Sequence, residues 1–181
     1  MTSIHLIRVG LAETGEIPRL EILDRLAAGM ARVFGISCRV CESVLEAGFA
    51  FDPIRNQYHS TAILQAMDPL ALQRRVRMLG VTLLDLFVPV LTFVFGEAQM
   101  NGPCGVVSVH RLAEEFYGLP ADPEKLERRL LIEALHEMGH TFGLRHCRDW
   151  QCAMASTHSV ERLDLKQPAF CASCKRAIAA L

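Results

Sequence analysis

The sequence lacks the features of several large protein classes. Its 181 residues carry a formal net charge of −1, and acidic and basic residues alternate without a basic stretch typical of nucleic-acid binding. The longest apolar tract, residues 81–95, is too short to cross a bilayer and contains Asp85 and Pro89. Residues 1–8 show no basic start followed by an apolar core, so no signal peptide is expected. We therefore expect a cytoplasmic protein that binds neither nucleic acid nor membrane.

Internal repeats and low-complexity linkers are also missing, which favours one domain spanning residues 1–181, with a monomer favoured. The chain is apolar enough to bury a substantial core, so a metal need not hold the whole fold together. Seven cysteines are present. Without a secretory signal they are better explained as metal ligands or free thiols than as a disulfide framework, and their odd number leaves at least one unpaired.

Strand-like and helix-like segments alternate along the first part of the chain. Strands are expected at residues 4–9, 36–41, 83–88, 91–95 and 105–110, and helices at 18–34, 57–67, 70–79 and 174–181. A long helix should begin with Asp122 as N-cap and Pro123 at its first position, continue through His140 and end at Gly143. This alternation predicts an α/β (α+β) fold with a mixed, mostly parallel sheet backed by helices.

The strongest functional signal is the stretch HEMGHTFGLRH at residues 136–146. His136 and His140 share one face of a helix because they are four residues apart. Two such imidazoles can bind one Zn²⁺ and leave Glu137 free to act as general base on a bound water. HExxH alone also arises by chance. The added Gly143 and His146 complete the longer metzincin pattern, in which glycine permits a sharp turn and the third histidine reaches the metal.

Four cysteines near the carboxyl end have the number and spacing of a structural zinc site. They are Cys147, Cys152, Cys171 and Cys174. Disulfides and a redox-sensitive thiol cluster are the alternatives. Another CxxC at Cys38 and Cys41 lies in an expected strand, where residues three apart point to opposite faces, so it is a poor metal site. Cys104 is expected to be an ordinary buried thiol.

Beyond these motifs, the chain resembles the archaemetzincin family of metzincin-clan zinc metalloproteases. The resemblance is carried by residues 136–146, by Cys147-x4-Cys152-Ala153-Met154, by CASC at 171–174, and by the upstream segments 57–64, 85–89 and 93–98. It covers most of the chain beyond about residue 35.

The resemblance implies a metzincin-like zinc peptidase with two zinc ions, one catalytic and one structural. It implies an active-site helix within an amino-terminal subdomain of about residues 1–143 and a small, irregular, zinc-bound lobe of about 144–181. Met154 is the candidate for the methionine turn below the catalytic metal, with simple core packing as the alternative. The chain departs from the family at residues 155–159, ASTHS, where His158 either lines the substrate pocket or is a surface histidine.

Substrate features are less specific. Peptidases often bind substrate as an added strand, and Gly105–His110 is the candidate sheet edge, with an interior strand as the alternative. Glu97 and His110 are candidates for binding a peptide amino terminus or polarising a carbonyl. We expect hydrolysis of small peptides, including cleavage from the amino terminus. The alternatives are a zinc-stabilised binding protein with an idle HExxH site and a thiol redox sensor.

Because His146 and Cys147 are adjacent, the structural zinc is expected to fix the third catalytic ligand.

Overall fold

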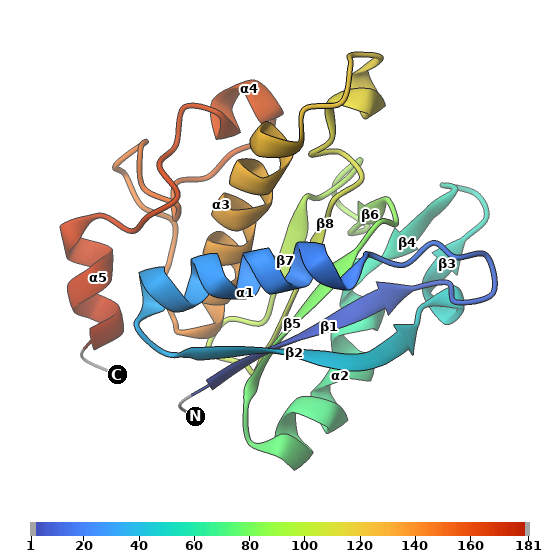
Figure 1. The fold of residues 1–181 in the computed structure, drawn as a ribbon, viewed down its shortest axis with the longest axis horizontal. Coiled ribbons are helices and arrows are strands. Elements are labelled where there is room, and N and C mark those ends of the chain that lie inside the picture. Colours follow the sequence, from blue (N-terminus) through green and yellow to red (C-terminus); the bar gives the residue numbers. More distant parts are fainter. Residues whose placement is uncertain (1–2, 180–181) are drawn as a thin grey trace.

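A twisted five-stranded sheet forms the centre of the molecule in the computed structural model, which describes residues 3–179 (Figure 1). The strand order is β2-β1-β5-β8-β7, in which only β7 runs antiparallel to its neighbour. The strands are β1 (Ser3–Gly10), β2 (Ser37–Glu46), β5 (Arg77–Thr82), β7 (Gly96–Ala98) and β8 (Cys104–Ser108). The predicted mixed, mostly parallel sheet is confirmed.

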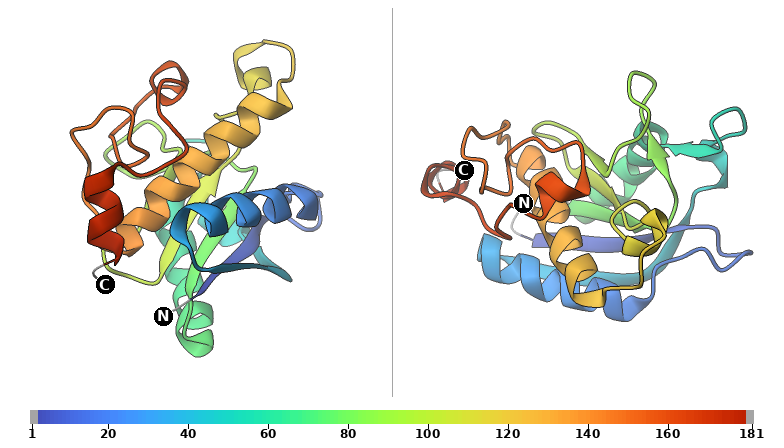
Figure 2. Two further views of the ribbon diagram at one scale, coloured as in Figure 1. Left: turned by 60° about the vertical axis from the view of Figure 1, so that its left-hand side comes forward. Right: turned by 90° about the horizontal axis from the view of Figure 1, so that it is seen from above.

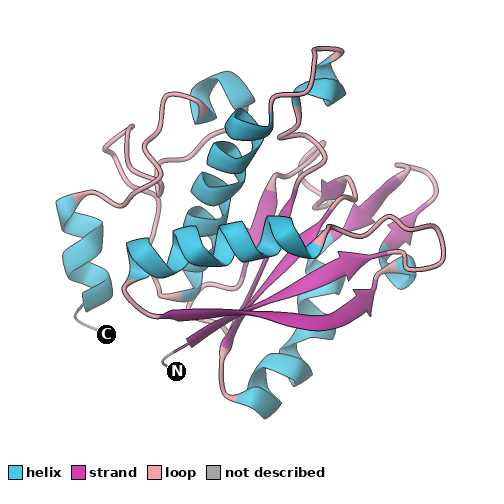
Figure 3. Ribbon diagram, in the orientation of Figure 1, coloured by secondary structure: helices cyan, strands magenta, loops and turns pink. Residues whose placement is uncertain are grey.

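Helices cover both faces of this sheet (Figure 3). α1 (Leu20–Phe34) and α3 (Pro123–Thr141) lie on one face, and α2 (Ser60–Arg74) lies on the other. Each face has its own apolar core: one cluster joins α1 and α3 to the sheet, and a second joins α2 to it. The helices predicted around residues 18–34 and 123–140 are confirmed.

Smaller elements complete the fold. A second, three-stranded sheet has the order β3-β4-β6 and consists of β3 (Phe51–Asp52), β4 (Gln57–His59) and β6 (Leu86–Phe87). Two 3-10 turns are η1 (Gly48–Ala50) and η2 (Glu114–Tyr117). The segment after α3 is mostly irregular and lies alongside that helix, with the short helices α4 (Val160–Leu163) and α5 (Ala172–Ala179) (Figure 2). Within residues 3–179, no helix is long and apolar enough to cross a membrane.

Several sequence predictions about secondary structure are wrong. The helix predicted at 57–67 begins only at Ser60, because residues 57–59 form strand β4, and the strand predicted at 83–88 is reduced to Leu86–Phe87. Helix α2 does not break at Asp68-Pro69 but continues through Pro69 to Arg74. β5 then begins at Arg77, inside the helix predicted at residues 70–79. Residues 91–95 form no strand, because only Val94 makes an isolated bridge to Leu86. The helix predicted at 174–181 begins at Ala172, and residues 180–181 lie outside the described residues.

The predicted substrate-binding edge is also wrong. Residues 104–108 form β8, which lies between β5 and β7 and is buried at all five positions. A short apolar run without polar alternation is typical of a strand covered on both faces, and this pattern fits Gly105-Val106-Val107 better than an edge. The true edge beside α3 is β7, whose three residues are partly exposed.

Candidate active site and metal centres

Helix α3 positions the predicted metal ligands at its buried carboxyl end. It begins as predicted: the Asp122 side chain accepts a hydrogen bond from the Lys125 backbone N–H at 3.0 Å, and Pro123 occupies the first position. It ends at Thr141, and Gly143 follows with φ of 81°, a left-handed conformation that glycine adopts without strain. The chain therefore turns back where the sequence predicted that it would.

The Nε2 atoms of the two helix histidines point toward the same position. His136 Nδ1 donates to the Ala153 carbonyl at 2.9 Å, and His140 Nδ1 donates to the Leu144 carbonyl at 2.7 Å. These bonds fix the tautomer in which each Nε2 carries a lone pair. The two Nε2 atoms are 3.1 Å apart. Two lone pairs at that distance repel each other unless a cation lies between them, and a tetrahedral zinc would hold two nitrogens about 3.3 Å apart.

His146 completes the group from outside the helix. The ligand atoms of His136, His140 and His146 all lie within 4.8 Å of one another. Burial, above other causes, lowers the pKa of all three imidazoles, and that of His136 falls to about 3. The rings are therefore neutral near pH 7, which is the form that binds metal. Donor type, tautomer and spacing fit a zinc ion with a remaining position for water or substrate.

Glu137 lies beside this group and is almost fully buried. Strand β7 passes close to it at Gly96, where an added Cβ would approach Glu137 Cγ to 2.7 Å. Burial is the main cause that raises the pKa of Glu137 well above its ordinary value, and the charges of Glu133 and Glu97 add to the effect. A carboxylate so poorly solvated is a strong proton acceptor when a cation nearby keeps it ionised.

A cleft of about 520 Å³ opens onto the three histidines and Glu137. Residues 91–98 form one part of its lining, and Ser156, Thr157 and His158 form another. Of the uncertain sequence candidates, Glu97 and the exposed His158 therefore lie in the cleft. His110 is not among its lining residues; its ring packs edge-on against Phe116 with centroids 5.2 Å apart.

Glu97 is tied to the start of α2. Its carboxylate accepts a hydrogen bond from Ser60 Oγ at 2.5 Å and a second, shared between its two oxygens, from Thr61 Oγ1 at 2.8 and 3.0 Å. These bonds anchor the edge strand β7 to the helix behind it. Both oxygens of Glu97 thus already accept hydrogen bonds within the protein.

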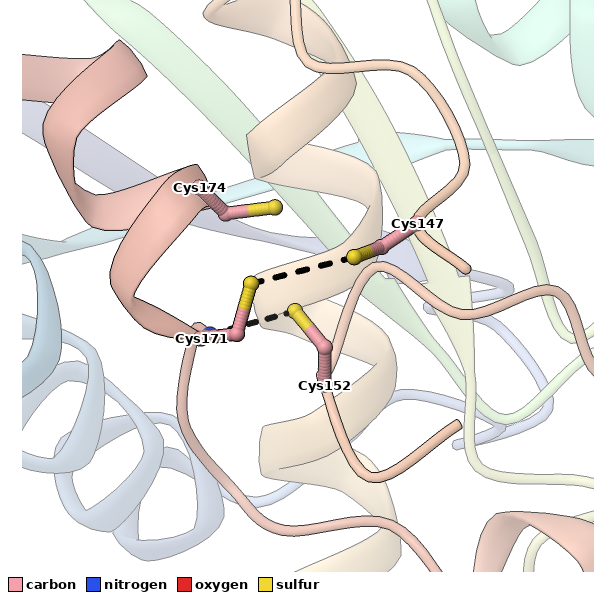
Figure 4. A group of neighbouring side chains, drawn as sticks. All are labelled: Cys147, Cys152, Cys171 and Cys174. Atoms are coloured by element: carbon pink, nitrogen blue, oxygen red, sulfur yellow. Dashed lines mark hydrogen bonds between the residues drawn. The ribbon is translucent and has the colours of Figure 1, made fainter. Parts of the chain in front are cut away.

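The four predicted cysteines also meet. Cys147 and Cys152 lie on the loop after α3, and Cys171 and Cys174 lie at the start of α5 (Figure 4). Their sulfur atoms all lie within 4.8 Å of one another, and the Cys147–Cys171 sulfur distance is 3.7 Å. That distance excludes a disulfide, which requires about 2.0 Å, and matches the roughly 3.8 Å between two thiolates on a tetrahedral zinc. The backbone N–H of Cys174 is the main cause that lowers the pKa of Cys171 to about 7.

The other cysteines behave as predicted. Cys38 packs against the core that contains α1, whereas Cys41 belongs to the core that contains α2. Their sulfurs therefore lie on opposite faces of the sheet. Cys104 is fully buried, and burial raises its thiol pKa to about 12.

Met154 packs directly under the motif helix. It is fully buried, and a Cβ added at Gly139 would lie 2.3 Å from its Sδ and 3.2 Å from its Cε. Glycine between the two helix histidines is thus needed for the close approach of the methionine. The sequence indicated Met154 but gave no reason for Gly139.

Replacing Gly139 with alanine should destabilise the protein by about 1–3 kcal/mol, because the buried Met154 has little space to move. On helix propensity alone the same change would stabilise by about 1 kcal/mol. The free energy of urea unfolding measures the effect. In a Met154→Ala background the added Gly139→Ala should cost nothing further; an equal cost in both backgrounds would contradict the contact.

The cysteine-bearing loop contacts the histidine site at several points. The Cys147 backbone N–H donates to the Met154 carbonyl at 2.8 Å. Ala153, between Cys152 and Met154, supplies the carbonyl that orients His136. The Lys166 ammonium, which is fully buried, donates to the same carbonyl at 3.2 Å. The loop thus supports a helix ligand as well as the adjacent His146.

Sequence reasoning missed two buried charged residues near the site, Glu133 and Lys166. Glu133 could have been recognised from the sequence, because a glutamate is unusual within the apolar run LLIEAL. It also lies four residues before Glu137, on the same helix face. Lys166 could not have been recognised, because its segment has no regular secondary structure and its burial depends on tertiary packing.

Comparisons with known proteins agree with this geometry. The archaemetzincin of Methanocaldococcus jannaschii is 35% identical over 94% of this chain and 92% of its own length. The model of peptidase family M54 matches residues 51–180. The chain belongs to peptidase family M54, the archaemetzincins. The resemblance stated from the motifs is therefore confirmed, and the protein is a zinc metallopeptidase.

Solved archaemetzincin structures share the fold. A zinc-dependent peptidase from Methanocorpusculum labreanum superposes with a TM-score of 0.84 at 28% identity, covering 97% of this chain and 99% of its own. The archaemetzincin of Archaeoglobus fulgidus, solved with malonate, has a TM-score of 0.79 at 30% identity with the same coverage. The predicted fold class of this archaemetzincin is confirmed.

Proposed function

We propose that the protein hydrolyses small peptides, including cleavage from the amino terminus, with a catalytic zinc held by His136, His140 and His146. The observation that carries this proposal is the pair of Nε2 atoms 3.1 Å apart, each ring fixed through Nδ1, at the base of an open cleft. The preference for small peptides follows from the family resemblance and the compact size of the protein.

Zinc bound there would act as a Lewis acid that lowers the pKa of a water and polarises the scissile carbonyl. Glu137 takes a proton from the attacking water as the water oxygen bonds to the carbonyl carbon. Glu137, now a protonated carboxyl group, then donates that proton to the amine nitrogen as the C–N bond breaks. Its burial next to Gly96 restricts its position and keeps bulk water from solvating it.

Substrate would lie along β7. This strand is at the sheet edge, lines the cleft, and has one side without a neighbouring strand among the described residues. An extended peptide can pair with that side and pass its scissile bond over the histidines. The tether from Glu97 to Ser60 and Thr61 keeps the edge fixed during this pairing.

The four cysteines would hold a second, structural zinc. Such a site, closed by four sulfurs, supports folding and leaves no position for water. We propose a boundary near residue 143 between the subdomain that carries the helix ligands and the zinc-bound lobe that carries Met154. The two would not be independent, because residues from both belong to one apolar core.

Metal analysis combined with a peptide-library digest tests the proposal. We expect two zinc ions per chain, cleavage of short peptides that stops on chelation, and recovery when zinc is restored. Libraries with free and acetylated amino termini separate aminopeptidase from endopeptidase cleavage. A zinc-loaded protein that cleaves no peptide would support the binding-protein alternative. Zinc loss with disulfide formation under mild oxidant would support the redox sensor.

A further inference from the structure

One carboxylate in the cleft, that of Glu133, has no role in the proposed mechanism. Glu133 lies one helical turn before Glu137, is 4% exposed, and lines the cleft. Its Oε1 atom is buried and has no hydrogen-bond partner within residues 3–179. Buried polar atoms are nearly always paired, so an unpaired carboxylate oxygen on a residue that lines a cleft indicates a missing donor.

Lys166 does not supply that donor. Its ammonium donates to the Ala153 carbonyl at 3.2 Å, and in the described part of the chain no ion pair joins it to Glu133. Burial raises the pKa of Glu133 to about 7, and the charge of Lys166 opposes that rise, which favours the carboxylate form. The hydrogen-bonding capacity of Oε1 is still unfilled.

The other cleft carboxylates are already occupied. Glu137 faces the reacting water in the proposed mechanism, and Glu97 accepts its hydrogen bonds from Ser60 and Thr61. No lysine or arginine is among the residues that line the cleft. Glu133 is therefore the cleft carboxylate with a buried oxygen that has no hydrogen-bond partner among the described residues.

The chemistry of the Glu133 carboxylate indicates which kind of ligand group it would bind. A buried carboxylate is best satisfied by a charged donor, because an ammonium or guanidinium both fills its lone pairs and neutralises it. Ser156 and Thr157, whose side chains are short, line the same cleft.

We propose that Glu133 binds a positively charged group of the substrate and makes the enzyme prefer cationic peptides. The group is an ammonium or guanidinium, either on a lysine or arginine side chain next to the scissile bond or at the free amino terminus. The inference rests on the proposed peptidase function and adds a substrate class to it.

Pairs of fluorogenic peptides that differ by one acetyl group test this on the wild-type enzyme. One pair carries lysine or Nε-acetyl-lysine beside the cleaved bond, and the other carries a free or acetylated amino terminus. We expect kcat/KM to be about 10-fold or more higher for the charged member of one pair, chiefly through KM, as for a buried charge-assisted hydrogen bond. The pair that responds identifies the source of the cation. Ratios near one in both pairs would overturn the proposal.

Glu133→Gln assigns the preference to this residue. The responding ratio should fall to within about threefold of one, whereas Glu124→Gln, an exposed change on the same helix, should leave the ratio at its wild-type value. A ratio retained in Glu133→Gln would overturn the assignment. A purely structural role would lower stability without altering the ratio. Should Glu133→Gln fail to fold, Glu133→Met, a neutral side chain of similar length, is measured instead, and a wild-type ratio in that variant would equally overturn the assignment.

Binding separates this inference from the proposed function. If no peptide is cleaved, fluorescence anisotropy of the same labelled peptides with zinc-loaded protein still compares charged and acetylated members. Tighter binding of the charged member would then support Glu133 as a cation site while the peptidase proposal fails. Equal binding would overturn the inference.

Discussion

Replacing Glu137 with glutamine is expected to lower kcat by about 10²–10⁴-fold, the usual contribution of a positioned general base. Glutamine has nearly the same shape but cannot take the proton from water. The variant should still bind zinc at the three histidines, because Glu137 is not a proposed ligand. Its stability should not fall, since burial disfavours the charged carboxylate that the change removes. Steady-state kinetics, metal analysis and thermal unfolding measure the three quantities.

The control for this variant is Glu124→Gln, which removes a carboxylate from the exposed first turn of the same helix. It should keep wild-type kcat. A Glu137→Gln enzyme with full zinc content and a kcat within about threefold of wild type would rule out Glu137 as the base. Loss of both zinc and activity would instead assign it a role in metal binding.

The grouping of the three histidines proposed as metal ligands could be predicted because their geometry is mostly local. His136 and His140 meet through the helical repeat alone, and Gly143 reverses the chain within three residues of the second ligand. The cysteine group needed a longer-range assumption, since Cys171 lies 24 residues after Cys147 in sequence. The group could still be predicted because four cysteines at this spacing are typical of a structural zinc site.

Sheet topology could not be predicted in the same way. β7 has three residues and no apolar alternation, so nothing in Gly96–Ala98 marks it as the edge that borders the site. The apolar run at residues 105–107 favours a strand covered on both faces, but it does not show which strands are its neighbours. The helix break predicted at Pro69 was wrong for a different reason. Helix α2 tolerates the missing N–H because the rest of the helix is held by packing against the sheet.

Glu133 shows what sequence pattern leaves out. A lone glutamate in an apolar helix can be recognised as unusual, but whether its oxygens are paired depends on residues far along the chain. Here the candidate partner, Lys166, is 33 positions away and uses its ammonium on Ala153. That Glu133 Oε1 has no hydrogen-bond partner can be recognised only from the structure, which places Glu133, Lys166 and the cleft relative to one another.

Replacing Cys171 with serine is expected to remove the second zinc and to lower peptidase activity by about 10–100-fold, although no catalytic group is changed. The reason is the contact between lobe and site. Cys152 and Met154 flank Ala153, whose carbonyl orients His136, and Cys147 directly follows the ligand His146. Releasing the sulfurs frees that loop, so both ligands lose their fixed orientation.

Cys38→Ser is the matched control, because Cys38 is a half-buried thiol on the central sheet that does not belong to the four-cysteine group. It should retain two zinc ions and wild-type activity. For Cys171→Ser, zinc content and kcat/KM are measured on protein whose fold has been checked by circular dichroism. A folded variant with one zinc and full activity would separate the two metal sites and refute the coupling. One zinc with reduced activity would show that the cysteine lobe acts on the reaction by holding His136 and His146 in place.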